Sequence, residues 1–236
     1  MHTLYDVETQ IPAFFHITEA SVHDSKVMIE IPYEPSSYYI FDRGYNNFKM
    51  LYKIHQIEVY FVVRAKKNLQ YKSIQWKRRL LKNVLSDASV LLTGFYPKQY
   101  YPEPLRLVKY WDEEQEREFT FITNAMHIST LQVAELYKNR WRVELFKWLK
   151  RYLKIKRFLG TTENAVRIQI YAAIYTYCLV AIIQHDMLLD RSTYEVLQIL
   201  SISLTDKTRL RDLFNKTNFN NDKERYGFCE PSLFNF

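Results

Sequence analysis

Two short apolar runs with a helix-like segment between them constrain the fold more than any other feature of this sequence. Residues 38–41 (YYIF) and 59–63 (VYFVV) are almost wholly apolar, which is typical of strands that are buried on both faces. Between them, Phe48, Leu51, Tyr52 and Ile54 recur at helical spacing. The order strand, helix, strand predicts an α/β fold.

The remaining sequence divides around this centre. Residues 2–7 and 11–17 are split by Glu8-Thr9-Gln10, which predicts a hairpin. Beyond the second apolar run, β-like stretches alternate with polar turns and predict an antiparallel insertion; these stretches are residues 90–95, 105–111 and 119–123. From Ser129, a suitable N-cap, the pattern is helical, with helices expected at residues 129–155, 163–184, 193–200 and 207–216. We therefore expect three parts, which are residues 1–67, 68–128 and 129–236.

Composition excludes several classes of protein. Only 4 glycines are present, and no glycine-rich phosphate loop occurs, so nucleotide-binding motifs are absent. The two cysteines, Cys178 and Cys229, form neither a disulfide framework nor a metal knuckle, and no signal peptide is apparent. A cytoplasmic protein is therefore expected. Residues 168–183 are mostly apolar but shorter than the roughly 20 residues of a membrane span, so we predict a buried central helix rather than a membrane protein.

The positive charge of the chain is concentrated on one segment. Net charge is +7, and residues 129–157 contain nine Lys or Arg against two acidic residues, Glu135 and Glu144. Tyrosine and tryptophan side chains lie among these cations. A basic, aromatic segment of this kind favours a nucleic-acid partner, although a solvated helix face with long lysine side chains is the alternative.

Two carboxylates occupy positions that suit a catalytic role. Asp42 directly follows the first buried strand, where a side chain projects from the sheet edge into a crevice. Glu144 lies inside the basic segment. Taken alone, Asp42 is also explained as a turn residue before Gly44, and Glu144 as the ion-pair partner of a neighbouring cation on its helix.

Helical geometry groups Glu144 with other polar residues. On an ideal helix, Tyr137, Arg140, Glu144 and Arg151 fall within about 60° of one another. This face presents one aromatic ring, two guanidinium groups and one carboxylate to a common partner. A DNA strand whose phosphates contact the arginines, and whose scissile bond reaches a metal ion on the carboxylate, would fit it.

Two motifs resemble one family. Tyr137-x-x-Arg140-x-x-x-Glu144, followed two turns later by a basic residue, resembles the Y-R-E-K signature of one group of bacterial insertion-sequence DDE transposases. Phe41-Asp42-Arg43-Gly44-Tyr45 resembles the second catalytic aspartate of that group. Further similar stretches are His23-Asp24, Arg64-Ala65-Lys66, residues 155–162 (IKRFLGTT) and residues 233–236 (LFNF). The resemblance covers essentially the whole chain.

The resemblance implies a fold and an activity. The fold is a ribonuclease-H-like core, a β-rich insertion before the glutamate helix, and a helical carboxy-terminal region. The activity is metal-dependent cleavage and transfer of double-stranded DNA at insertion-sequence ends, by two Mg²⁺ (or Mn²⁺) ions. Asp42 and Glu144 would be catalytic metal ligands, and the chain would act as a homodimer. DNA contacts are implied for Tyr137, Arg140, Lys150, Arg151, Arg64 and Trp141.

Two departures from the family pattern affect the expected activity. The first catalytic aspartate of the family precedes the hairpin, so we expect an incomplete core without its first strand; Asp6 lies in the hairpin turn and is not taken as a replacement. Lys150 falls one position early, about 120° from Glu144 on an ideal helix, and Arg151 takes the expected face. We therefore predict a truncated and inactive transposase copy. The alternative is a non-catalytic DNA-binding remnant.

Overall fold

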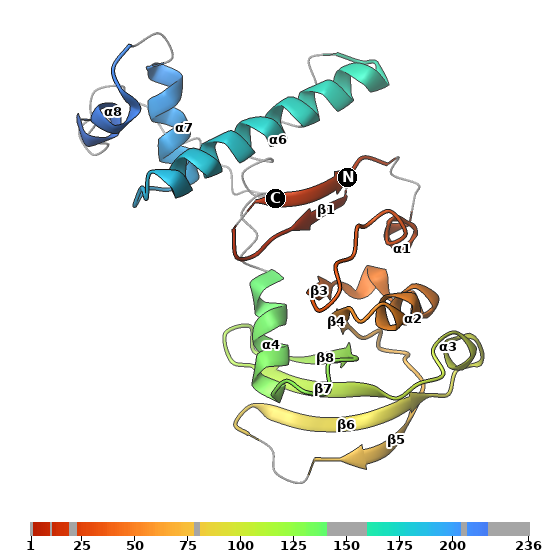
Figure 1. Cartoon of the computed structure of the whole chain (residues 1–236). Coiled ribbons are helices and arrows are strands. Elements are labelled where there is room, and N and C mark those ends of the chain that lie inside the picture. Colours follow the sequence, from red (N-terminus) through yellow and green to blue (C-terminus); the bar gives the residue numbers. More distant parts are fainter. Residues whose placement is uncertain are drawn as a thin grey trace. The chain divides into compact units, whose positions relative to one another are not determined.

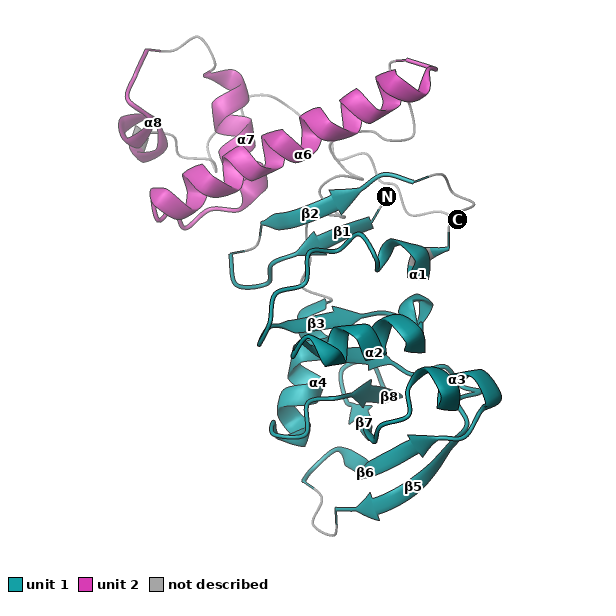
Figure 2. Cartoon of the chain, turned by 45° about the vertical axis from the view of Figure 1, so that its right-hand side comes forward, with its two compact units in different colours: residues 1–144 teal, residues 145–236 magenta. Residues whose placement is uncertain are grey.

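The computed structural model describes residues 2–9, 11–18, 23–77, 81–140, 160–203 and 207–216. The chain divides into two compact units, residues 1–144 and residues 145–236 (Figure 2). The first unit contains every strand described and several helices, and the second contains three described helices. An α/β architecture with a mixed sheet is therefore confirmed for the first unit.

A six-stranded sheet forms the centre of the first unit (Figure 1). Its strand order is β3-β4-β8-β7-β6-β5, with β3 parallel to β4 and every other neighbouring pair antiparallel. The strands are β3 (Tyr38–Phe41), β4 (Tyr60–Arg64), β5 (Tyr71–Trp76), β6 (Val84–Leu92), β7 (Leu105–Asp112) and β8 (Arg117–Thr123). The antiparallel strands predicted within residues 68–128 thus continue the sheet of the two central strands.

Both faces of this sheet are covered, which explains why its central strands are almost wholly apolar. Phe61 and Val63 of β4 belong to a core shared with α2 (Phe48–Gln56), which contributes Leu51. Val62, between them, belongs to a second core shared with α4 (Thr130–Asn139). Side chains alternate between the faces along a strand, so α2 and α4 lie on opposite sides of the sheet (Figure 1).

The amino-terminal residues form the predicted hairpin. Strands β1 (His2–Tyr5) and β2 (Pro12–His16) pair antiparallel as a separate two-stranded sheet. Leu4 packs against the core of the six-stranded sheet, and the His2 ring contacts the Tyr45 hydroxyl with 3.2 Å between Nδ1 and Oη. Helix α1 (Asp24–Val27) follows the hairpin.

Strand β5 and helix α3 (Phe95–Tyr100) are among the elements that were not predicted. Strand β5 lies at the sheet edge, and four of its six residues are exposed, so its sequence lacks a strong apolar alternation. Helix α3 contains Pro97, which opposes a helix interior but is tolerated in a first turn. Of the long helix predicted over residues 129–155, α4 is the described part; residues 141–159 lie outside the described residues.

The second unit contains α6 (Glu163–Asp186), α7 (Thr193–Ile202) and α8 (Leu210–Lys216). The prediction that α6 is a buried central helix is wrong. Only one stripe of it is buried, at Ala173, Ile174, Tyr177 and Val180, whereas Tyr175 and Leu179 are each 62% exposed. Among the described elements, α6 packs against α7 through Val180 and Ile199. Within the described part of the chain, α6 alone has the length and apolar composition of a membrane span, and 28% of its most apolar window is buried.

Candidate functional site

Asp42 lies at the carboxyl end of β3, immediately before the 3₁₀ helix η1 (Arg43–Tyr45). The strand positions it because β3 is parallel to β4, and the ends of parallel strands open into a crevice where side chains can meet a ligand. The Asp42 side chain remains 38% exposed. Its carboxylate is therefore held by the fold but still accessible to solvent.

Two side chains contact this carboxylate: one from α4 and one from the residue that caps its carboxyl end. The Tyr137 hydroxyl donates to Asp42 Oδ1 at 3.2 Å, and Arg140 Nη2 lies 3.1 Å from Asp42 Oδ2. Tyr137 and Arg140 are three residues apart, which places them on the same side of a helix. The structure thus brings three of the sequence-predicted site residues into direct contact.

The surroundings of Asp42 favour its ionised form. Partial burial raises the pKa of the carboxyl, but this is outweighed by a hydrogen bond from the Arg43 backbone, the charge of Arg140, the Tyr137 hydroxyl and the charge of Arg64. The net effect lowers the pKa of Asp42 below its ordinary value. Asp42 is therefore a carboxylate at neutral pH, the form that binds a cation.

Tyr137 itself is a core residue. Only 1% of its surface is exposed, and its ring packs against Phe121, with ring centroids 4.6 Å apart. Burial, and then the negative charge of Asp42, raise the pKa of Tyr137 to about 12 against the opposing charges of Arg140 and Arg64. The phenol therefore stays protonated and donates to Asp42.

Arg64 approaches the site from the neighbouring strand. It ends β4, and its guanidinium lies over the ring of Phe119, 4.9 Å from the centroid. The turns after β3 and β4 are tied together by Asn46, whose Nδ2 donates to the carbonyl oxygens of Arg43 and Arg64 at 2.8 Å each. This bridge fixes the end of β4 beside Asp42.

A buried ion pair that the sequence did not reveal anchors α4 to the sheet. Arg106 on β7 and Asp87 on β6 are 2% and 1% exposed, and two hydrogen bonds of 2.8 and 2.6 Å join them. Arg106 also donates to the carbonyl of Ile128 at 2.6 Å and to Thr130 Oγ1 at 3.1 Å, at the start of α4. In the sequence, Asp87 is the single charged residue of β6, but Arg106 is one of three charged residues in β7.

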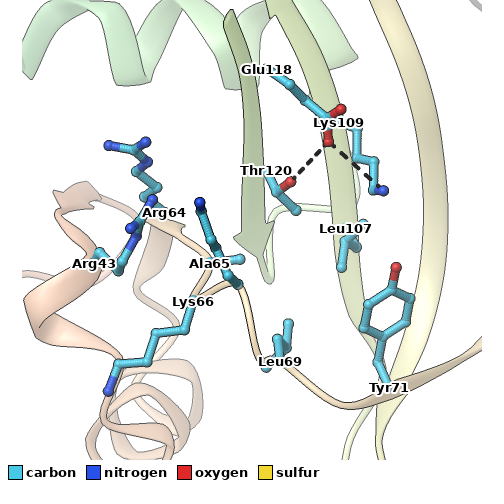
Figure 3. Close-up of a pocket in the computed structure, with 11 residues that line it drawn as sticks. Arg43, Arg64, Ala65, Lys66, Leu69, Tyr71, Leu107, Lys109, Glu118 and Thr120 are labelled. Atoms are coloured by element: carbon cyan, nitrogen blue, oxygen red, sulfur yellow. Dashed lines mark hydrogen bonds and ion pairs between the residues drawn. The ribbon is translucent and has the colours of Figure 1, made fainter.

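A pocket of about 330 Å³ opens beside Arg43 and Arg64 (Figure 3). The β4–β5 connection and the middle of β7 and β8 supply its other walls. Five cations and a single acid line it, together with small or apolar groups: Arg43, Arg64, Lys66, Lys67, Lys109, Glu118, Ala65, Leu69, Tyr71, Leu107 and Thr120. Of these cations, Arg64 also lowers the pKa of Asp42 through its charge, whereas Arg43 lowers it through its backbone N–H.

Asp42 suits a divalent cation as one ligand of a larger set. Its oxygens are hard donors, the kind that Mg²⁺ and Mn²⁺ prefer. Among the residues that the structure describes, no group of three or more His, Cys, Asp or Glu is close enough to hold a metal ion. Glu144, Lys150, Arg151 and Trp141, the other predicted site residues, lie outside the described residues.

Comparison with known proteins identifies the family. A family model described as the transposase DDE domain matches residues 1–179. This chain belongs to the DDE transposase family. Membership agrees with the α/β architecture of the first unit.

Curated proteins similar to this DDE transposase chain carry transposase names. One of Sinorhizobium fredii, named transposase y4zB, is 34% identical over 221 residues, which are 90% of this chain and 60% of the relative. A transposase of insertion sequence IS5377 of Geobacillus stearothermophilus is 29% identical over 184 residues, 76% of this chain and 48% of the relative. A third, of insertion sequence IS4SA of a Synechocystis strain, is 26% identical over 192 residues. The chain spans about half to three fifths of the length of these relatives.

Proposed function

We propose that this DDE transposase chain contributes Asp42 to a metal-dependent site that cleaves and joins DNA strands at insertion-sequence ends. The supporting observation is the carboxylate of Asp42, which is ionised and half-exposed at a strand end and contacted by Tyr137 and Arg140. The charges of Arg140 and Arg64, which act on this carboxylate, complement the phosphates of a DNA strand. Family membership makes DNA the substrate class of this proposal.

The proposed fold assignment follows the family. Strands β1 to β4 with α2 are the described part of a ribonuclease-H-like core, and β5 to β8 are a β-rich insertion that extends its sheet. Helix α4 is the described part of the helix predicted over residues 129–155, the range in which Glu144 falls. In this arrangement the core ends at residue 67, and the helical region begins at residue 129.

The proposed chemistry is in-line displacement at a phosphodiester. Asp42 and Glu144 would hold Mg²⁺ or Mn²⁺, which supplies activation of a water or 3′-hydroxyl and stabilisation of the leaving oxygen. Tyr137 and Arg140 orient the Asp42 carboxylate. Arg140 and Arg64 offer positive charge to the phosphate oxygens, where charge accumulates during the displacement.

A nicking assay tests this function. The chain is incubated with supercoiled plasmid carrying an insertion-sequence end, with Mg²⁺ or Mn²⁺ and in parallel with a chelator. Metal-dependent nicking that Asp42→Asn abolishes would support this function over the truncated and inactive copy that the sequence predicts. The matched control is Asp6→Asn, because Asp6 accepts from Thr9 in the hairpin turn, and its Oδ1 contact with the Glu8 backbone is retained by asparagine. Nicking that persists in Asp42→Asn would contradict the proposal.

The second candidate function is DNA binding without cleavage. One observation favours it: both oxygens of Asp42 already have protein partners, at 3.2 and 3.1 Å. In that case the wild-type chain binds plasmid with strong salt dependence, and neither metal nor Asp42→Asn changes the amount of nicked DNA.

A further inference from the structure

Arg140 contacts the carboxylate that the proposed function needs as a metal ligand. Its Nη2 lies 3.1 Å from Asp42 Oδ2, and the Tyr137 hydroxyl donates to the other oxygen, Oδ1, at 3.2 Å. The two contacts differ in kind, because the phenol is neutral whereas the guanidinium carries a full positive charge. A divalent cation at Asp42 would meet this like charge on the same carboxylate, so Arg140 opposes its binding.

The ion pair between Asp42 and Arg140 is able to open. Both side chains are partly exposed, and a solvent-exposed ion pair contributes little to stability. Tyr137, in contrast, is buried, and its ring packs against Phe121 with ring centroids 4.6 Å apart, so its hydroxyl stays in place. Arg140 can therefore leave the carboxylate at small cost while Tyr137 continues to orient it.

A phosphate of the DNA strand is the partner for which Arg140 would leave Asp42. A guanidinium can bind a phosphate through two parallel charge-assisted hydrogen bonds, which are stronger than an exposed ion pair. Arg64 provides a comparison, because its charge also acts on Asp42 while its guanidinium lies over the ring of Phe119, 4.9 Å from the centroid. The direct contact with Asp42 therefore distinguishes Arg140 from Arg64.

We propose that Arg140 is an internal counter-ion that keeps a divalent metal ion from Asp42 until a DNA phosphate draws the guanidinium away. The inference rests on the proposed function, which makes Asp42 a metal ligand and DNA the substrate class. Metal and DNA then bind cooperatively, because both favour the state in which the ion pair is open. The coupling is reciprocal, so DNA raises the affinity for metal by the same factor as metal raises the affinity for DNA.

The test is a titration of Mn²⁺ with the full 236-residue chain, in which electron paramagnetic resonance follows free Mn²⁺ with and without duplex DNA. The Asp42→Asn counterpart of each protein gives the background, which includes the Mn²⁺ taken up by the DNA itself. In the wild type, DNA should raise the Mn²⁺ affinity of the Asp42-dependent site at least about fivefold. Arg140→Gln should raise this affinity about as much without DNA, and DNA should then change it by less than about twofold.

The matched control is Arg64→Gln, which removes another positive charge that acts on Asp42 and leaves the contact of Arg140 in place. It should keep the DNA response of the wild type, and a response lost equally in Arg64→Gln would overturn the inference by attributing the effect to charge in general.

Two further outcomes separate this inference from the proposed function. If Mn²⁺ binding depends on Asp42 but Arg140→Gln keeps the DNA response of the wild type, or binds Mn²⁺ more weakly without DNA, the inference alone is overturned. If Asp42→Asn leaves Mn²⁺ binding to the wild-type chain unchanged, the proposed function is contradicted and the inference with it. The expected result in Arg140→Gln is a gain of affinity, which loss of folding cannot produce.

Discussion

At the scale of single residues, Tyr137 has two separate roles in the structure. Its ring fills the core between β8 and α4, and its hydroxyl donates to Asp42. Tyr137→Phe keeps the ring and removes the hydrogen bond, so we expect a loss of about 1 kcal/mol in the free energy of unfolding. Tyr137→Ala also empties the core and should lose about 3 to 5 kcal/mol.

Guanidinium unfolding curves of the two Tyr137 variants measure this difference. Tyr137→Phe should also raise the pKa of Asp42 toward its ordinary value, because one of the groups that stabilise the carboxylate is gone. Equal losses in Tyr137→Phe and Tyr137→Ala would show that the ring is not packed as described.

The residues of the candidate site could be predicted, but their contacts could not. Asp42 stands out because it ends an apolar strand, and Tyr137 and Arg140 because they share a helix face. The sequence predicted that Tyr137 and Arg140 face a common partner, but it did not predict that both contact Asp42. That contact depends on where α4 lies on the sheet, which is decided by residues far away in the chain.

At the scale of elements, the Asp87–Arg106 pair determines where α4 begins. Arg106 links β7 to the carbonyl of Ile128 and to Thr130, and the capping box of Ser129 and Gln132 completes the first turn of α4. Removal of one partner leaves a buried charge without compensation. Arg106→Met should therefore lose about 3 to 5 kcal/mol in the free energy of unfolding.

A double variant distinguishes the cost of an uncompensated buried charge from the loss of packing. Asp87→Leu combined with Arg106→Met replaces the ion pair with apolar groups and should recover most of the stability lost in Arg106→Met. Chemical unfolding of both proteins measures the recovery. A double variant as unstable as Arg106→Met alone would mean that the pair acts mainly through its hydrogen bonds to α4.

The same pair predicts a dependence of stability on pH. Burial raises the pKa of Asp87, but hydrogen bonds from Arg106, Thr130 and Lys77 outweigh it and lower the pKa from 3.8 to about 2. The pKa of Asp87 is lower in the folded than in the unfolded chain, so its ionised carboxylate stabilises the fold. This contribution to the free energy of unfolding is complete above pH about 4 and is lost as the pH falls toward about 2. The contribution is roughly 2 kcal/mol. Asp87→Asn should show a shallower decline in unfolding free energy over this pH range.

At the scale of the whole molecule, local patterns predicted most elements and missed how the sheet continues. The strand at β3 and the helix α2 were predicted because apolar runs and helical spacing are local signals. The pairing of β4 with β8 joins residues about sixty positions apart, and the sequence of neither strand indicates which strand it pairs with. The sequence therefore predicted an antiparallel insertion at residues 68–128, but not that its strands continue the sheet of β3 and β4.

The charge distribution of the chain also belongs to this scale. Within the first unit, Arg140 contacts Asp42 directly, and the charge of Arg64 also acts on it. In the proposed function, these two cations would attract the phosphates of a DNA strand to one carboxylate.

Direct measurement of Mn²⁺ binding tests the central claim that Asp42 is a metal ligand. Free Mn²⁺ is followed by electron paramagnetic resonance as it is titrated with the chain in the presence of duplex DNA, for wild type, Asp42→Asn and Asp6→Asn. The account predicts that wild type and Asp6→Asn bind Mn²⁺ alike and that Asp42→Asn binds at least tenfold more weakly, on the order of the loss expected for a metal ligand or its close support. Equal Mn²⁺ affinity in wild type and Asp42→Asn would contradict it.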